Sequence, residues 1–198
     1  MTCMRTLTCL RLITICTLVA AAGAASAHPF HGAGGGLAAG LAHPLLGLDH
    51  LLAMVAVGLW AAQLGGRWLW SVPLAFVTTM LAGGALGFLG YTLPLAEPLV
   101  ASSVLILGLF IALRVRLRWM GPALVAGFAL CHGLAHAAEL PPGTGALAYA
   151  AGFAAATAAL HALGLVLGVW MRTGNLALRL TGAPIALAGC WLLASTFV

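Results

Sequence analysis

Apolar residues run through this chain in long blocks, and short breaks rich in Pro, Gly or Arg separate the blocks. A helix needs about 20 mostly apolar residues to cross a bilayer, and Pro and Gly in the breaks are helix-ending signals. The pattern predicts an all-α, polytopic membrane bundle of six transmembrane helices. We place the spans at roughly 37–63, 68–90, 96–114, 119–138, 145–171 and 176–197.

The first 27 residues follow a different pattern. Two arginines precede an apolar stretch that ends near Ala22, and the small residues Ala25-Ser26-Ala27 follow. This order is typical of a secretory signal peptide. We predict a signal peptide over 1–27, cleaved after Ala27, and a transmembrane domain over 28–198. An uncleaved first span is the alternative.

Composition and charge agree with membrane insertion. The chain is 63% hydrophobic and only 6% charged, whereas a soluble domain is about 25% charged. Its eight basic residues are all arginine, and they are too few and too scattered for a nucleic-acid surface. After the signal peptide, every arginine falls on one side when six spans are threaded, and the positive-inside rule makes that side cytoplasmic. We therefore expect a bacterial inner membrane protein in contact with lipid, with both mature termini in the periplasm.

The first span carries ionisable groups that are costly at membrane depth. His43, Asp49 and His50 stand in an otherwise apolar run, and such residues usually mark an ion path or a binding site. Imidazole and carboxylate also suit divalent transition metals. Pro44 and Gly47 lie between the two histidines and predict a kink or a break between His43 and Gly47.

The fourth span carries a second pair of histidines. His132 and His136 are four residues apart, which places both on one helix face at a spacing that suits metal ligands. We predict that groups from both spans converge on one metal site in the outer half of the bundle. The predicted ligands are His43, Asp49, His50, His132 and His136.

Weaker candidates for the metal site or its pathway have plain structural alternatives. A solitary membrane histidine often makes an inter-helix hydrogen bond, and an acid in a first helical turn complements the helix dipole. A methionine in a span usually packs, and polar residues in a loop or a tail are usually solvated. These candidates are Glu97, Glu139, His161, His28, His31 and Met54.

Three segments resemble the HupE/UreJ family of small membrane proteins. The run HPLLGLDHLLAMVAVGLWAAQLGG looks like the family signature, FALCHGLAHAAEL resembles its second histidine motif, and LPLAEPLVASSVLILGL resembles its third-span segment. The likeness covers nearly the whole mature chain. It implies uptake of nickel, or sometimes cobalt, for hydrogenase or urease. One departure is Ala137, where the family motif usually has glycine.

The resemblance also implies roles for individual residues. It gives His43, Asp49 and His50 the metal role of the first motif, and His132 and His136 that of the second. The leading hypothesis is therefore a secondary permease for Ni²⁺, with Co²⁺ next. The chain has no nucleotide-binding loop, so energy must come from the membrane potential, a proton exchange or a separate partner. We predict no organic cofactor and no enzymatic activity.

Other functions remain open at this point. Paired membrane histidines also ligate haem in electron carriers. An intramembrane hydrolase would need a metal-bound water and a general base such as Glu139, and the chain lacks the usual hydrolase motifs. A metal sensor or chaperone would bind the ion without moving it. An oligomer or a metallochaperone partner is likewise left open.

Overall fold

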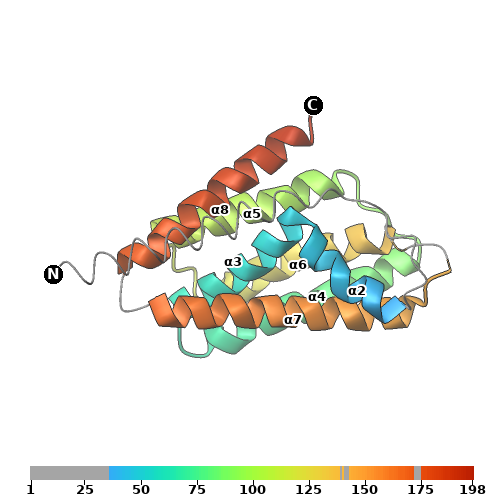
Figure 1. Ribbon diagram of the computed structural model, residues 1–198, viewed down its shortest axis with the longest axis horizontal. Coiled ribbons are helices and arrows are strands. Elements are labelled where there is room, and N and C mark those ends of the chain that lie inside the picture. The colour runs from blue at the N-terminus through green and yellow to red at the C-terminus, as the bar shows by residue number, and fades with distance from the viewer. Residues whose placement is uncertain (1–35, 139, 141–142, 172–174) are drawn as a thin grey trace.

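The protein is described by a computed structural model that covers residues 36–138, 140, 143–171 and 175–198. Within these ranges all regular structure is helical, which confirms the all-α prediction (Figure 1). The seven helices are α2 (Gly36–Leu46), α3 (Leu48–Leu64), α4 (Trp68–Phe88), α5 (Ala96–Leu113), α6 (Gly121–Ala138), α7 (Ala146–Trp170) and α8 (Asn175–Ser195).

Four of these helices, α4, α5, α7 and α8, are long and apolar enough to cross a membrane. The pair α2 and α3 passes the same test together but bends by 81°, so it counts as a fifth span if it is one broken span. The α6 helix is apolar but shorter. The helices therefore lie where the sequence predicts spans, with four or five candidate spans on length and composition. The predicted signal peptide lies outside the described residues.

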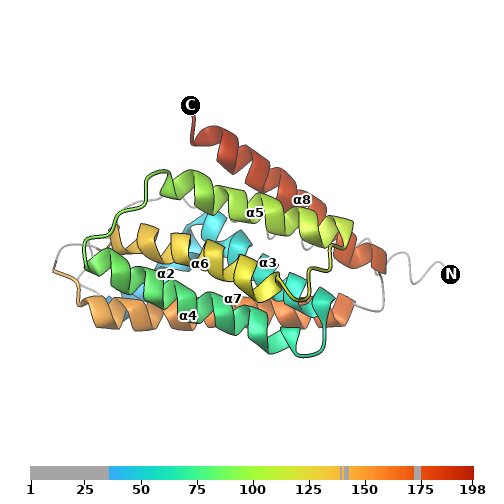
Figure 2. The ribbon, with the colours of Figure 1, turned by 180° about the vertical axis from the view of Figure 1, so that it is seen from behind.

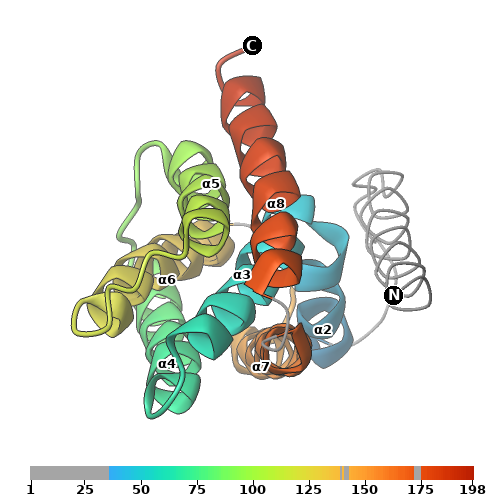
Figure 3. The same cartoon turned by 90° about the vertical axis from the view of Figure 1, so that its left-hand side faces the viewer.

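The α3 helix is the centre of the bundle. It packs against α2, α4, α5, α7 and α8 (Figure 3). From Leu52 to Leu64 every residue of α3 except Val55 is buried. Because α3 is enclosed on all sides, a polar group on it meets protein rather than lipid. The polar side chains of α3, which are near its two ends, therefore contact neighbouring helices.

Glycines let the surrounding helices approach closely in pairs. A Cβ atom added to Gly133 of α6 would overlap the backbone oxygen of Met80 in α4, and these two helices run side by side in Figure 2. A Cβ on Gly58 of α3 would overlap the backbone oxygen of His161 in α7, and Gly108 brings α5 equally close to α8. Such small-residue contacts are typical of membrane helix packing. They fix the register in which side chains from different helices meet.

The predicted break in the first span is present, at Gly47. This residue has an extended backbone (φ −87°, ψ 118°) and precedes the first turn of α3. Contrary to the local preference of a residue before proline, His43 stays helical and α2 continues through Pro44 to Leu46. Close packing of α2 on α7 around Gly40 and Gly152 holds that turn in place.

Candidate metal-binding site

The break brings together two histidines that a straight helix would hold apart. His43 lies in the last turn of α2 and His50 in the first turn of α3. Seven residues of continuous helix would separate them by about 10 Å along the axis. With the 81° bend, their ring centroids lie 5.7 Å apart in an edge-to-face contact.

His136 of α6 completes a cluster of three histidines. Its ring centroid lies 4.8 Å from that of His43 and 4.4 Å from that of His50. One ring nitrogen from each residue can be chosen so that all three lie within 4.8 Å of one another. Imidazole nitrogens bind zinc at about 2.0–2.1 Å, so nitrogens that share such an ion lie roughly 3–4 Å apart. Small side-chain adjustments would therefore let this three-histidine cluster hold one divalent ion.

Asp49 lies against His50 and fixes its ring. The Oδ1 atom of Asp49 accepts a hydrogen bond from Nδ1 of His50 at 2.5 Å and another from the backbone N–H of His50 at 2.8 Å. A carboxylate that accepts from Nδ1 leaves the lone pair of the neutral imidazole on Nε2. That Nε2 atom is buried and has no hydrogen-bond partner among the described residues. This is the arrangement in which a carboxylate orients a metal-binding histidine.

Gly47 leaves the space that this pair needs. A Cβ atom on Gly47 would lie 2.8 Å from Nδ1 of His50 and 2.9 Å from Oδ1 of Asp49. Both distances are shorter than real Cβ contacts. The glycine of the first motif therefore makes room for the Asp49–His50 hydrogen bond, besides forming the break.

His132 lies one turn before His136 on α6, beside the cluster. Its ring centroid is 5.5 Å from that of His50 and 6.4 Å from that of His136. Its Nδ1 atom is 2.9 Å from the backbone oxygen of Phe128, which can only accept. The lone pair of His132 is therefore on Nε2, which is buried and lacks a hydrogen-bond partner in the described part of the chain.

His161 lies further along the same row of rings. Phe76 of α4 touches His132 on one side, with centroids 5.3 Å apart, and His161 of α7 on the other, at 5.0 Å. The side chain of His161 is only 2% exposed, and neither ring nitrogen bonds to any residue that the structure describes. The histidines thus form a row from the three-histidine cluster, through His132 and Phe76, to His161.

The weaker candidates lie outside the three-histidine cluster. Met54 is fully buried in the apolar core, one turn after His50. Glu97 is an exposed residue in the first turn of α5. His28, His31 and Glu139 lie outside the described residues.

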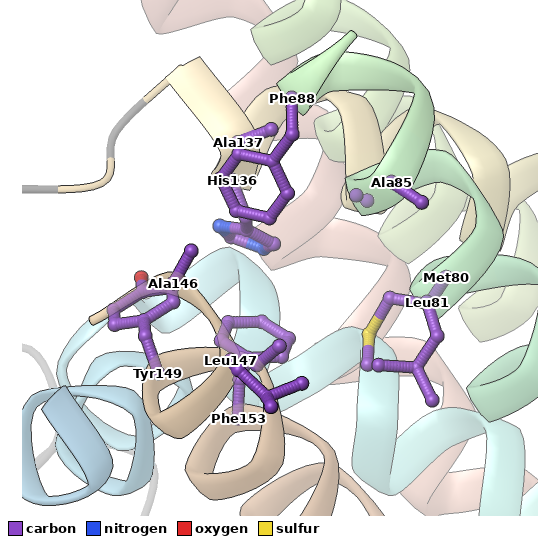
Figure 4. Close-up of a pocket in the computed structure, with 13 residues that line it drawn as sticks. Met80, Leu81, Ala85, Phe88, His136, Ala137, Ala146, Leu147, Tyr149 and Phe153 are labelled. Atoms are coloured by element: carbon purple, nitrogen blue, oxygen red, sulfur yellow. The ribbon is translucent and has the colours of Figure 1, made fainter.

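The aromatic wall around the cluster was not predicted from the sequence. Tyr149 and Phe153 of α7 pack on His43, with ring centroids 6.0 and 5.7 Å away, and Phe153 lies 4.2 Å from His136. Figure 4 shows the His136 ring between Phe88 on one side and these two rings on the other. The only hint was that Tyr149 and Phe153 are four residues apart, on one face of α7.

An apolar cavity of about 380 Å³ reaches His136 from the side (Figure 4). Its walls include Leu81, Phe88 and Leu147, which are well exposed on α4 and α7. An apolar opening does not suit a hydrated cation. The cavity therefore marks where side chains pack loosely beside the cluster and has no features of a cation entrance.

Comparisons with known proteins agree with these observations. The family model described as HupE / UreJ protein matches residues 16–192. The chain is 48% identical over 161 residues to Protein HupE of Rhizobium leguminosarum bv. viciae, an alignment that covers 80% of this chain and 84% of that protein. No solved structure matches the chain. With a family match over most of its length and a relative this similar, the chain belongs to the HupE / UreJ family.

Proposed function

We propose that this protein is a secondary permease for a divalent transition metal, Ni²⁺ first and Co²⁺ second, in the bacterial inner membrane. The observation that supports this most is the three-histidine cluster of His43, His50 and His136, whose ligand atoms lie within 4.8 Å of one another. Imidazole binds both ions, and Ni²⁺ more tightly than Co²⁺. Membership of the HupE / UreJ family supports a role in supplying metal to hydrogenase or urease.

The neighbours of the cluster favour a cation over a purely structural role. Asp49 brings one negative charge to the cluster, which offsets part of the cost of placing a doubly charged ion away from water. The lone pair of His50 is kept on Nε2 by Asp49, so this ligand needs no rearrangement of its protons before it binds. Asp49 thus orients His50 in this proposal, and a direct bond from Asp49 to the ion is the alternative.

The row of histidines supports a route for the ion. His132 and His161 are buried and have ring nitrogens that bond to nothing among the described residues. An unsatisfied buried polar group costs about 1–3 kcal/mol, so two such groups are hard to explain by packing alone. In our proposal the ion passes from the cluster to His132 and then, past Phe76, to His161.

The positions of the arginines support the proposed topology. Arg114, Arg116, Arg118 and Arg179 line one cavity near the last turn of α3, whereas His50 lies in the first turn. Thirteen residues of α3, or about 20 Å, separate His50 from Gln63, which lines the same cavity. If α6 is counted with the broken span and the four long helices, six spans place the arginines inside and the three-histidine cluster toward the periplasm.

The direct contacts among the histidine rings support a single small ion over haem. Edge-to-face and tilted contacts join all three rings of the cluster. A haem with two histidine ligands needs a flat macrocycle between them, and these contacts leave no slot for one. Colourless purified protein without a Soret band is the expected result.

The test is uptake of ⁶³Ni²⁺ into proteoliposomes that hold the full-length protein, with and without an imposed membrane potential. We expect His50→Ala to abolish accumulation while the protein still inserts. Cys190→Ala, an exposed position on α8, is the matched control and should transport like the wild type. Binding without accumulation in the wild type would argue for a sensor or chaperone, and uptake unaffected by His50→Ala would refute the site.

A further inference from the structure

A second cavity lies at the other end of α3 from the three-histidine cluster. It has a volume of about 420 Å³ and lies where the ends of α3, α5, α7 and α8 meet. Arg114, Arg116, Arg118 and Arg179 line it, together with the amide of Gln63. Four arginine side chains therefore line one small space, which we call the arginine cavity.

No described carboxylate neutralises these charges. The described acids are Asp49 and Glu97, and each lies in the first turn of its helix. The arginine cavity is at the opposite end of both helices, where Gln63 lies in the last turn of α3 and Arg114 caps the C-terminus of α5. At 1.5 Å per residue, the separation is about 20–25 Å. Arg179 donates from Nε to the backbone oxygen of Ala112 at 3.0 Å, and the positive charge that remains at the cavity suits an anion from outside this part of the chain.

The buried amide of Gln63 is a second feature that a ligand of this cavity can match. Its side chain is only 6% exposed, and Nε2 donates a hydrogen bond of 3.2 Å to the backbone oxygen of Phe110. Because a carbonyl oxygen only accepts, this bond fixes which end of the amide is nitrogen. The Oε1 atom is then a buried acceptor without a partner among the residues described. A ligand with a hydroxyl or other donor beside its anionic group would satisfy this acceptor.

The loop that carries Arg114, Arg116 and Arg118 is held in shape by hydrogen bonds of its own. The indole N–H of the fully buried Trp60 donates to the backbone oxygen of Val115 at 2.9 Å. The backbone N–H of Val115 donates to Phe110, and that of Arg118 donates to Arg116. A preformed loop loses little entropy on binding, which favours a specific site.

Arginines that serve only to orient the protein in the membrane need not line one cavity together. Arg67 lies beside the same end of the bundle, yet its guanidinium stacks on the rings of Trp68 and Trp119, at 4.4 and 4.7 Å. It does not line the cavity. Arginines that only orient the protein in the membrane can be scattered in this way, whereas the other four line one cavity.

The surroundings favour a lipid over a soluble anion. Large apolar side chains are exposed beside the arginine cavity, since Leu113 is 66% and Leu176 is 65% exposed. These positions at helix ends suit contact with acyl chains. Basic pockets between membrane helices on the cytoplasmic side are known to bind acidic headgroups.

We propose that the arginine cavity binds the headgroup of an acidic glycerophospholipid such as phosphatidylglycerol. The phosphate lies among the arginines, and a headgroup hydroxyl donates a hydrogen bond to Oε1 of Gln63. This site is separate from the proposed metal pathway and does not depend on it.

The first test is native mass spectrometry of the full-length protein in detergent, with added phosphatidylglycerol or phosphatidylcholine. We expect the wild type to retain phosphatidylglycerol selectively. The double variant Arg116→Gln, Arg179→Gln should retain it at least about tenfold less, because loss of even one charge-assisted hydrogen bond weakens binding by about tenfold or more. Arg67→Gln removes one charge at the same face and should behave like the wild type. Equal retention by the double variant, or equal loss in Arg67→Gln, would overturn the proposal.

A second test addresses the hydroxyl and also covers a double variant that fails to fold. Gln63→Met keeps the size of the side chain and removes the acceptor. The wild type should prefer phosphatidylglycerol over phosphatidylmethanol, which is anionic but has no headgroup hydroxyl, and Gln63→Met should lose that preference. An unchanged preference would overturn the role of Gln63. Displacement of phosphatidylglycerol by excess inorganic phosphate would overturn the lipid assignment in favour of a free anion.

Discussion

The substitution Asp49→Asn tests whether Asp49 orients His50 through its negative charge. The asparagine side chain has nearly the same shape, so the fold around the break should be kept. It removes the charge that accepts hydrogen bonds from Nδ1 of His50 at 2.5 Å and from the backbone N–H of His50 at 2.8 Å. The asparagine oxygen still accepts from Nδ1 but carries no charge, and the amide nitrogen can instead donate to Nδ1, so the preference that keeps the lone pair of His50 on Nε2 is weakened.

The expected magnitude follows from that hydrogen bond. A hydrogen bond to a charged group contributes about 1.5–3 kcal/mol, and each 1.4 kcal/mol is tenfold in a binding constant. Loss of a carboxylate that orients a metal-binding histidine typically costs 10–100-fold in metal affinity. We therefore expect Asp49→Asn to raise the Kd for Ni²⁺ by about 10–100-fold, whereas His50→Ala removes a ligand and should have the larger effect.

The assay is calorimetric titration of the detergent-purified protein with Ni²⁺. Ser102→Ala is the control, because it removes one half-buried side-chain hydrogen bond, to Pro98 on α5, without touching the three-histidine cluster. An affinity of Asp49→Asn within about twofold of the wild type would refute the orienting role, given the magnitude expected for such a carboxylate. X-ray absorption of the nickel complex adds a check. If the variant has one oxygen ligand fewer than the wild type, Asp49 binds the ion directly.

Three further substitutions, one with a control variant, test the space beside His50, the packing of α6 on α4 and the role of His161. Gly47→Ala should weaken Ni²⁺ binding without unfolding the protein, because the new Cβ would lie 2.8 Å from Nδ1 of His50; calorimetry with an unchanged affinity would contradict this. Gly133→Ala should lower stability by about 1–3 kcal/mol in thermal denaturation, since its Cβ overlaps an α4 backbone oxygen. Gly127→Ala, with open space around its Cβ, is the control and should be neutral. His161→Ala should slow ⁶³Ni²⁺ uptake while Ni²⁺ affinity is kept, and an equal loss of affinity would move His161 into the binding site.

The pattern of apolar blocks was sufficient to locate the helices. Each predicted span coincides with a helix or, in the first case, with the α2–α3 pair. The break between His43 and Gly47 was also predicted, because Pro44 and Gly47 act locally on the backbone. The local preference of His43 was overruled, since close packing of α2 on α7 holds His43 in the helix.

The chemistry of the candidate site was predicted only in part. His43, His50 and His136 were foreseen from residue type and spacing, and the structure brings them together. From spacing alone, His132 and His136 were equally good candidates for metal ligands, since both are on one face of α6. Their difference, with His136 in the cluster and His132 beside it, depends on where α6 meets the bend between α2 and α3.

The membrane class, the helix positions and the residue types able to bind a metal ion could be predicted from the sequence, because these depend on composition and on contacts within one or two turns. Which groups meet depends on how the helices pack against one another. The row through Phe76 to His161, the aromatic wall of Tyr149 and Phe153, and the approach of Gln63 to the arginines all join different helices. Their register depends on close glycine contacts between helices, and the periodicity of a single helix carries no information about the partner helix that it will face.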